Sequence, residues 1–560
     1  MKTFGMTAVL LGLAVCINAQ PVSPDTLYRH KVLYDPSGRI LGWHQPEIPG
    51  AVYHRVVTLA SEFLLHVPLE PRTGLPMHLV TCCFEDPYIK PDKAFEARKW
   101  MHNPACFFAG CVQSLAVQYR PYCGDDRYVD LVREMLDYQL AHGMTPSGFV
   151  WPNVPYASSD PFEPEYRGSV LWEKRGDGLY GIEPDKVGEL GHAFLQFYKI
   201  TGEEKYLQAA IHCADALAKN VQEPTAWYES GGGEHEDIVI DRSPWPFRVD
   251  AQTGAVIDPY CSNVLEPVKL LNELLRLDGR IALSTEQAAA FRRAKGIAWG
   301  WLFSRNGPLR TFIWNGFFED VVSDPTLSNR VQITPVELAK YLARHSEEAI
   351  GAGVDIHVPA LLYYALSAFK ADGIDAMKEQ LWCYNSMGSH TARFGAACAL
   401  WFEYSGEERF RDMAFRYLNM ASYMTHDDGV VSTGLDYTGG VWFSDGYSDY
   451  IRHFLDAMAA VPAWAPANEN HFLRSSSVIQ AIHYRPEAIT YRTFDPAATE
   501  RFRLTQKPAG IIAGTRAIQE NTDLSSEGWT WEPCPAGGGI LNIHHQRDAS
   551  VTIQMDKGGI

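Results

Sequence analysis

The sequence of 560 residues has few basic residues and lacks a long internal apolar run. Its 49 lysine and arginine residues face 67 acidic ones, which gives a net charge of -18, and no basic cluster reverses this charge locally. Electrostatic repulsion therefore argues against a nucleic acid as substrate or partner. Beyond the N-terminus, no apolar stretch reaches the roughly 20 residues that a membrane-spanning helix requires. Stable insertion into a membrane is not expected.

Motifs for several kinds of catalytic chemistry are also missing. There is no phosphate loop, no dinucleotide fingerprint and no Ser-His-Asp order, and the glycines at 231–233 are not followed by a strand-to-helix nucleotide pattern. No CxxC pair and no Cys/His cluster with zinc spacing is present. We therefore expect neither a cofactor nor a structural metal ion.

The N-terminus has the pattern of a secretory signal peptide. Lys2 supplies the charged start, residues 6–17 form a short apolar core, and Ala19 precedes the expected cleavage site. We predict that residues 1–19 are removed and that the mature protein is secreted or periplasmic. It would keep ten of the 11 cysteines, an even number that permits disulfides in an oxidising compartment. Cys213 and Cys398 lie within apolar helical patterns, where a free thiol packs as a small hydrophobic group.

A motif that recurs three times predicts helical hairpins. The copies are residues 124–128, 202–206 and 406–410. In each, a glycine is followed by two acidic residues, a basic residue and an aromatic residue. The glycine ends one helix, the acidic residues favour the positive first turn of the next, and the aromatic packs back across the hairpin.

Further helix pairs extend this pattern. They are expected at 264–277 with 286–303, 358–369 with 374–382, and 390–402 with 411–423, with additional helices near 52–66 and 447–459. Residues 189–198 carry few charges, as in a covered helix, whereas residues 207–219 have one apolar stripe. Inner and outer helices therefore alternate. About six or seven hairpins with unequal loops predict a closed toroid rather than an open superhelix.

The C-terminal part has a different character. From about residue 478, alternating polar and apolar residues form short segments broken by Pro, Gly and Asp, which predicts an antiparallel β-sandwich. The expected domains are the signal peptide, a helical barrel over residues 20–472 and a β-sandwich over residues 473–560. The β domain is either a stabilising appendage, which is the favoured interpretation, or a sugar-binding module.

This arrangement resembles the (α/α) barrels of the six-hairpin glycosidases, among them glucuronidase-like glycoside hydrolases, and the related barrel polysaccharide lyases. The resemblance rests on the hairpins and covers roughly residues 40–465. It is specific for the fold and weak for the substrate. It implies a mainly α protein with an (α/α)6 or (α/α)7 barrel, a C-terminal β domain and an oligo- or polysaccharide substrate.

A polar ring is expected at one end of the barrel. The longest loops, near residues 143–185, 220–260, 304–355 and 425–445, all enter predicted inner helices, so their residues should gather at one mouth. Each polar residue alone could be an ordinary helix cap. Together they would suit a carboxylated sugar. The ring comprises His102, Asn103, Asp185, Glu189, Tyr260, Asn263, His357, His390, Arg393, Asp445 and Tyr447.

Two loops could supply the carboxyl groups that a glycosidase needs. The first carries Glu234, Glu236 and Asp241 after three glycines. Its alternatives are a solvated acidic loop or a structural calcium site built from carboxylates. The second places Trp314 near Glu319, where aromatic rings and acids could hold a sugar, although an aromatic core is an equal alternative. Weaker instances of an aromatic beside a polar group are Trp43 with His44 and Tyr166 with Arg167.

Three functions remain open. The favoured one is a glycoside hydrolase on a uronic-acid-containing glycan, for which the resemblance implies an exo-acting β-glucuronidase as one form. The second is a polysaccharide lyase, in which a tyrosine or histidine removes a proton beside a neutralised uronate carboxylate. Its candidates are Tyr260, Tyr447, Asn263, His357, His390 and Arg393. The third is a non-catalytic glycan-binding protein, supported only by the β domain and the aromatic content.

Overall fold

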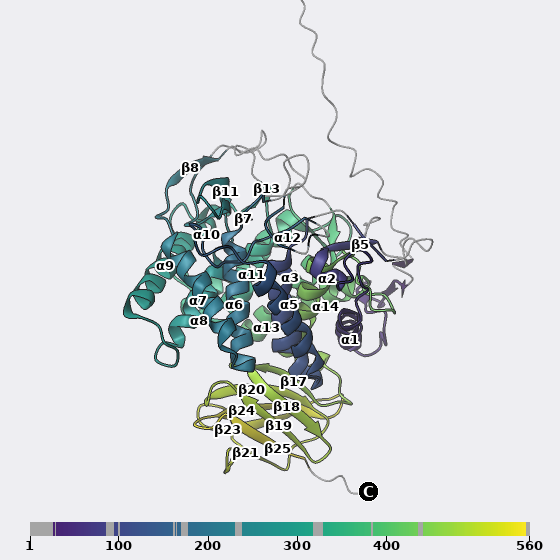
Figure 1. Ribbon diagram of the computed structural model, residues 1–560. Coiled ribbons are helices and arrows are strands. Elements are labelled where there is room, and N and C mark those ends of the chain that lie inside the picture. The colour runs from purple at the N-terminus through teal and green to yellow at the C-terminus, as the bar shows by residue number, and fades with distance from the viewer. Residues whose placement is uncertain are drawn as a thin grey trace, which may run out of the picture.

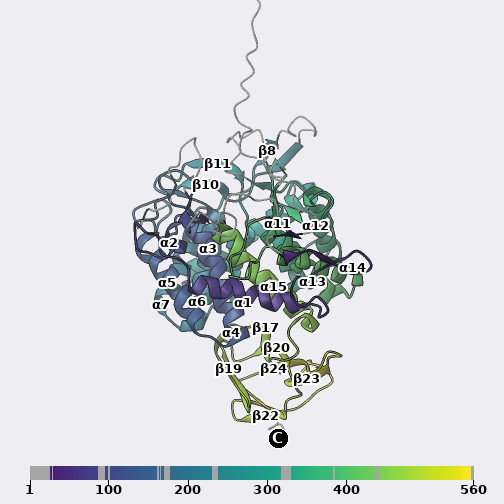
Figure 2. The same cartoon turned by 90° about the vertical axis from the view of Figure 1, so that its right-hand side faces the viewer.

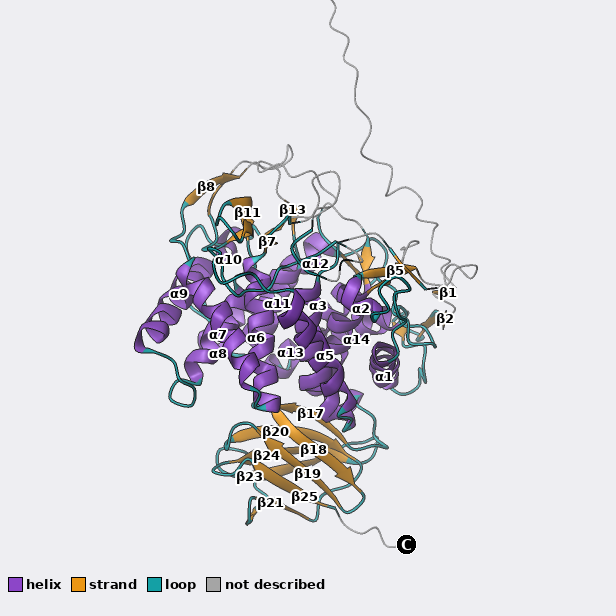
Figure 3. Ribbon diagram, viewed as in Figure 1, coloured by secondary structure: helices purple, strands orange, loops and turns teal. Residues whose placement is uncertain are grey.

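The computed structural model describes residues 26–27, 30–85, 95–98, 101–160, 163, 165–169, 177–229, 238–316, 329–381, 385–434 and 441–555. A helical region lies between short strands and loops at one end and a β domain at the other (Figures 1, 2 and 3). The predicted signal peptide lies outside the described residues. Among the helices described, none is both long and apolar enough to cross a membrane.

The helices form an inner and an outer layer. The inner helices are α3 (Pro104–Cys111) with its π-helical continuation η1 (Val112–Tyr119), α6 (Pro184–Thr201), α8 (Leu265–Arg276), α11 (Ile333–Arg344), α13 (Gly388–Ser405) and α15 (Asp449–Ala460). The outer helices are α1 (Ala51–Leu65), α5 (Arg127–His142), α7 (Glu204–Lys219), α9 (Thr285–Phe303), α12 (Val354–Phe369) and α14 (Glu408–Ser422). Shorter helical turns are α2 (Met77–Val80), α4 (Arg120–Cys123), α10 (Pro308–Thr311), η3 (Ser346–Glu348), η4 (Ser444–Ser448) and η5 (Pro462–Trp464).

These helices pair into hairpins that close on themselves. Five inner helices pack against the outer helix that follows them, and the last inner helix, α15, packs against the first outer helix, α1, and against η1. The described helices therefore make six pairs, and the predicted barrel of helical hairpins is confirmed. Burial explains the layers: α13 is buried continuously from Gly388 to Trp401, whereas α7 hides only part of its surface.

The repeated motif acts as the sequence predicts. Gly202 has φ +74°, in the left-handed region where glycine is favoured, and its N–H donates to the Tyr198 carbonyl to end α6. Glu204 lies in the first turn of α7, and Tyr206 is fully buried. Residues 124–128 and 406–410 repeat this geometry, with φ +77° at Gly124 and +72° at Gly406.

One predicted pair is wrong. Residues 358–369 belong to α12, but this helix is in the outer layer, and no described residue of the predicted helix 374–382 is helical; β14 lies there instead. The inner partner is α11, which the sequence prediction missed. Its charged residues Glu337, Lys340 and Arg344 interrupt the apolar pattern, because they face other charged groups inside the barrel rather than solvent.

Short strands lie at the end of the barrel where the inner helices begin. β7 (Gly181–Ile182), β10 (Pro246–Asp250) and β11 (Val256–Cys261) form one sheet, and β5 (Cys83–Glu85), β6 (Glu96–Ala97) and β16 (Val441–Trp442) form another. The two-stranded sheets pair β1 (Thr26–Leu27) with β2 (His30–Lys31), β3 (Leu33–Tyr34) with β4 (Ile40–Leu41), β8 (Ala226–Glu229) with β9 (Ile238–Asp241), β12 (Asn315–Gly316) with β13 (Asn329–Arg330), and β14 (Met377–Lys378) with β15 (Ser386–Met387).

The C-terminal β domain contains two antiparallel sheets. One orders its strands as β17 (His471–Ser475), β20 (Ala498–Leu504), β24 (Gly539–His545) and β23 (Gly528–Pro533). The other runs β18 (Ile479–Arg485), β19 (Ala488–Thr493), β25 (Ser550–Gln554), β21 (Gly510–Ala513) and β22 (Arg516–Ile518). Phe502 and Leu541 from the first sheet share a hydrophobic core with Ile489 and Ile553 from the second. The predicted antiparallel β domain is confirmed; its sandwich arrangement stays a prediction.

Polar contacts fix the β domain to the end of the barrel where the inner helices end. The buried Arg120 guanidinium donates to the carbonyls of Ile479 and Gln480, at 2.9 and 2.7 Å. Glu403 at the end of α13 accepts two bonds from Arg474, at 2.6 and 2.7 Å. These contacts hold the β domain against this end of the barrel.

Candidate active site

Several predicted catalytic residues cannot be placed from their side chains. Glu234, Glu236 and Glu319 lie outside the described residues, as does most of the acidic loop. Tyr260 belongs to β11, but its side chain is not described. Asp241 is described: its carboxylate accepts from Ser304 and Asn306 at 3.4 and 3.3 Å. These contacts tie the β8–β9 hairpin to the end of the outer helix α9.

Tyr447 is a core residue rather than a base that faces a cavity. Its side chain is fully buried and stacks on Phe63, with 5.2 Å between ring centroids. Its hydroxyl accepts a hydrogen bond from the Val431 backbone N–H at 3.1 Å. Asp445, its neighbour in η4, has a side chain outside the described set.

His102 and Tyr166 pack together inside the protein. Their ring centroids lie 5.7 Å apart, and neither side chain is exposed. The Tyr166 hydroxyl donates to the Leu79 carbonyl. Burial lowers the pKa of His102 to about 3, and neither ring nitrogen has a partner among the described residues. A neutral buried imidazole is a core group rather than a ligand for a uronate.

The other predicted binding residues are spread over the outer layer and the loop-rich end. Trp43 donates to the Ser422 carbonyl at 2.9 Å, beside outer helix α14, and His44 lies at its ring edge. His357 is on outer helix α12, and Arg167 is exposed. The structure does not bring these four residues together. Asn103, Asn263 and Trp314 lie near the N-terminal ends of inner helices α3, α8 and α11.

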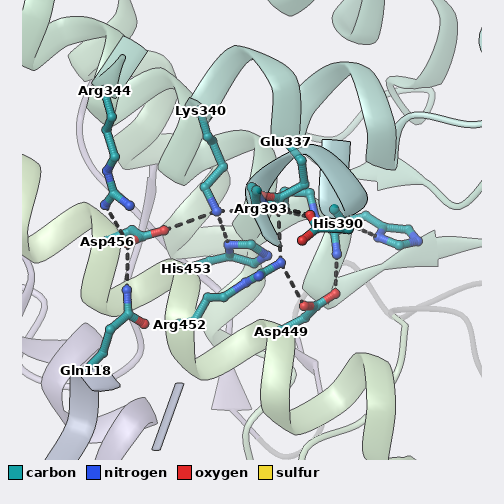
Figure 4. A network of polar contacts seen from close by, with 12 residues as sticks. Gln118, Glu337, Lys340, Arg344, His390, Arg393, Asp449, Arg452, His453 and Asp456 are labelled. Carbon is teal, nitrogen blue, oxygen red and sulfur yellow. Dashed lines mark hydrogen bonds and ion pairs between the residues drawn. The ribbon is translucent and has the colours of Figure 1, made fainter. Parts of the chain in front are cut away.

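His390 and Arg393 belong to a charged network inside the barrel (Figure 4). Arg393 is 1% exposed, and its Nε donates to Glu337 at 3.0 Å. Its other nitrogens donate to His390 Nδ1, at 2.5 Å, and to Asp449. Arg393 thereby joins inner helices α11, α13 and α15. Because its donors are already used by protein groups, we assign it a positioning role.

The network continues toward the β domain. Arg452 pairs with Glu337 at 3.0 Å and Asp449 at 2.9 Å. Asp456 pairs with Lys340 at 3.1 Å and Arg344 at 2.7 Å. Burial opposes ionisation of Asp456, but Arg344 and Lys340 hold the pKa of this carboxyl well below its ordinary value. These ion pairs keep the charged groups of facing inner helices in fixed positions.

A cavity of about 1230 Å³ extends from this network toward the β domain. Its deep end is lined by Glu189 and His192 of α6, Glu266 and Lys269 of α8, and Arg452 of α15. It continues past the C-terminal ends of the inner helices, where residues of β17 and of the loop after β19 form part of its wall. This cavity therefore extends from the network toward the β domain, away from the predicted mouth.

Two glutamates at the deep end differ in their surroundings. Burial, Glu266 and Asp449 raise the pKa of Glu189 well above its ordinary value. The Glu189 carboxyl makes no hydrogen bond or ion pair to any described residue. Glu266, by contrast, forms an ion pair with Lys269 at 2.7 Å. Glu189 is thus suited to hold a proton beside a second carboxyl group, which is ion-paired with a lysine.

A histidine lies one helical turn from Glu189 on the same wall. Burial lowers the pKa of His192 to about 4, although Glu273 opposes the shift. The ring is therefore neutral near pH 7, and its Nε2 lies 3.0 Å from the Gln196 amide nitrogen. A neutral imidazole has a nitrogen that can accept a proton, although its lowered pKa makes it a weak base.

A second charged cluster lies at the other end of α6. The fully buried Arg248 guanidinium pairs with Asp177 and, at 2.9 Å, with Glu183. Burial raises the pKa of Asp177 to about 7, although Arg248 opposes the shift. Burial opposes ionisation of Glu183, but Lys186 and Arg248 lower its pKa to about 2. Every charge here has a protein partner, so we interpret this cluster as the support of the loop that enters α6.

Glu189 belongs to the predicted ring, whereas the charged residues around it were not predicted. Glu266, Lys269, Glu337, Lys340 and Arg452 lie on inner helices, where the hairpin pattern predicts apolar residues. The signal was available as charges at helical spacing, such as residues 266, 269, 273 and 276 on one face of α8. Such a stripe on a helix that the fold must cover indicates a charged interior.

The chain is similar in fold to solved structures at low identity. Over 73% of this chain and 96% of that chain, it matches a cellobiose 2-epimerase from Spirochaeta thermophila DSM 6192 with 11% identity and a TM-score of 0.48. An unsaturated glucuronyl hydrolase specific for heparin matches with 9% identity and a TM-score of 0.44, over 73% of this chain and 97% of that chain. A GH76A alpha-1,6-mannanase from Salegentibacter sp. HEL1_6 matches with 11% identity and a TM-score of 0.43, over 73% and 99%.

Each of these proteins is named for an activity on a carbohydrate, in keeping with the group that the sequence pattern resembles. No protein family model matches the chain, and no curated protein matches it.

Proposed function

We propose that the protein is a glycoside hydrolase that acts on a uronic-acid-containing glycan, with Glu189 as the general acid. The observation that carries this proposal is the pair of glutamates at the deep end of the cavity. Hydrolysis of a glycosidic bond uses one carboxyl group that donates a proton and one carboxylate that acts as base or nucleophile. Glu189, with its raised pKa and free carboxyl, suits the first role.

Glu266 suits the second role. It lies on the adjacent inner helix, lines the same cavity and is held by Lys269 at 2.7 Å. Its charge in turn favours the proton on Glu189. A carboxyl group with a raised pKa beside a second carboxyl group that is ion-paired with a lysine is an arrangement that acid–base catalysis can use.

The composition of the cavity wall supports an anionic sugar. Eight lysine and arginine side chains line it, as many as the aspartate and glutamate side chains, although the whole chain has a net charge of -18. With Glu189 protonated, the lining is more positive than the rest of the protein. A carboxylated sugar would therefore be favoured there over the remaining surface. Export from the cytoplasm and exo action are parts of the same proposal.

The test is a product assay with the purified mature protein. Uronate-containing and neutral glycans are incubated with the native protein, and new reducing ends and the ultraviolet absorbance of unsaturated uronates are followed together. We expect reducing ends without absorbance, and about a 10²–10⁴-fold loss of turnover in Glu189→Gln. Glu204→Gln, at the start of outer helix α7, is the matched control. Full turnover in Glu189→Gln would reject the proposed acid.

His192 supports a second candidate function. A neutral imidazole one turn from Glu189 could remove a proton beside a uronate carboxylate, as a polysaccharide lyase requires. This reaction would give reducing ends together with ultraviolet absorbance. Loss of both signals in His192→Gln, with little effect of Glu189→Gln, would select the lyase over the hydrolase.

A further inference from the structure

The cavity has an exposed end and a buried end. Its exposed lining residues include Arg276, Arg280, Pro496 and Ala497, which lie where the barrel meets the β domain. Toward the opposite end, Glu337 in the first half of α11 is 6% exposed. This difference indicates that the open end is beside the β domain and not at the loop-rich end of the barrel.

The ion-paired network on the loop-rich side of the cavity explains why the substrate would enter beside the β domain. Arg393, in the first turns of α13 toward the loop-rich end, is 1% exposed and contacts Glu337, His390 and Asp449. A sugar that came from the loop-rich end would have to separate these ion pairs. Breaking a buried ion pair costs several kcal/mol, so the route past the β domain is favoured.

One basic side chain at the entrance, Arg276, makes no hydrogen bond or ion pair with a described residue, although its charge acts on the nearby Glu273. Arg280 pairs with Asp495, and Arg474 pairs with Glu403 at 2.6 Å. Arg276, in the last turn of α8, lines the cavity and makes no hydrogen bond or ion pair with a described residue. Its five N–H donors remain available, and a planar guanidinium binds a carboxylate through two parallel hydrogen bonds.

An aromatic ring lies at the same end. Tyr404 lines the cavity, is 44% exposed and stacks on Trp401 with 5.2 Å between ring centroids. Aromatic side chains that expose a face while fixed by a second ring offer an apolar surface for a sugar ring. The entrance thus combines a free cation and a rigid aromatic surface.

We propose that substrate enters the cavity between the barrel and the β domain, and that Arg276 binds the carboxylate of a uronic acid at this entrance. The inference rests on the proposed function and assigns the β domain a role in substrate access. The glycan would then reach Glu189 from the β-domain side of the Arg393 network.

Two variants test the entrance. Arg276→Gln removes the cation, and its control is Arg293→Gln on outer helix α9, where the side chain is 58% exposed. Binding of glucuronate and of glucose to the full chain is measured by calorimetry. A charge-assisted bidentate contact should favour glucuronate by about 10-fold in the native protein. This preference should vanish in Arg276→Gln and persist in the control.

Ala497→Trp narrows the entrance, and Ala517→Trp on the edge strand β22 is its control. Turnover of a uronate-containing glycan should fall in Ala497→Trp alone. An unchanged preference for glucuronate over glucose in Arg276→Gln would overturn the proposed entrance. Unchanged turnover in a folded Ala497→Trp would overturn it as well. If Glu189→Gln is inactive while both entrance variants behave as the native protein, only this inference fails; if Glu189→Gln is fully active, the proposed function fails.

Discussion

The Arg393 Nε donates to Glu337 Oε1 at 3.0 Å, which joins inner helices α13 and α11 inside the barrel. Both side chains are buried, and each has further partners of opposite charge. This contact therefore belongs to the framework that holds the walls of the cavity in place.

Removal of the Arg393 charge should destabilise the fold. Arg393→Leu leaves Glu337 and Asp449 with one basic partner fewer in a buried site, a change that costs about 3–5 kcal/mol in comparable pairs. The free energy of unfolding, measured with denaturant, should fall by that amount. Arg409→Gln, whose side chain is 58% exposed, should change stability by less than about 0.5 kcal/mol. Equal stability of the two variants would contradict the framework role.

The hairpin glycines should be intolerant of a side chain for conformational reasons. Gly202 has φ +74° with open space around it, so Gly202→Ala meets no clash but adopts a strained backbone. We expect a loss of about 1–2 kcal/mol. Gly296→Ala, inside α9 with open space and ordinary helical φ, should instead gain about 0.5–1 kcal/mol. Thermal unfolding of the two variants checks this opposite sign.

Acid should weaken the protein through Asp456. The folded-state pKa of this carboxyl is depressed by Arg344 and Lys340 against the opposing effect of burial, so its contribution is present above the unfolded-state pKa of about 4 and is lost as pH falls. Asp456→Asn should therefore be less stable than the native protein at pH 7. The difference should shrink at pH 3, where chemical unfolding is repeated. A difference that does not depend on pH would contradict this assignment.

Glu189 should have the opposite dependence. Its folded-state pKa is raised by burial, Glu266 and Asp449, so the folded protein holds the proton more tightly and loses stability as pH rises through and above the unfolded-state value. Glu189→Gln keeps a neutral group at all pH values. Its stability relative to the native protein should increase between pH 4 and pH 9, as measured by denaturant unfolding at each pH. A constant difference would show that Glu189 is not protonated preferentially in the fold.

The sequence predicts the hairpins well because their signals are local. Gly202, Glu204 and Tyr206 specify a helix end, a helix start and a packing contact within five residues. The free buried thiols Cys213 and Cys398 follow from the same apolar patterns and are confirmed. The β domain is recognised by its alternation, which also arises within each strand.

The site is harder to predict because it depends on contacts between distant helices. Glu337 and Arg452 are 115 residues apart, and neither charge is explained by its own segment. Candidates such as Tyr447 and His102 occupy suitable sequence positions but turn into the core. The polar ring expected at the loop-rich end stays a prediction, as do Glu234, Glu236 and Glu319, and the charged interior is a feature that the sequence prediction lacked.

The most direct test of the central claim compares leaving groups in Glu189→Gln. An acid that protonates the departing oxygen matters for a poor leaving group, such as a sugar alkoxide, and little for an acidic phenol that departs without help. We predict a loss of about 10²–10⁴-fold in kcat on a uronate-containing glycan and a much smaller loss on a nitrophenyl glucuronide. Equal losses on the two substrates would contradict the assignment of Glu189 as the general acid.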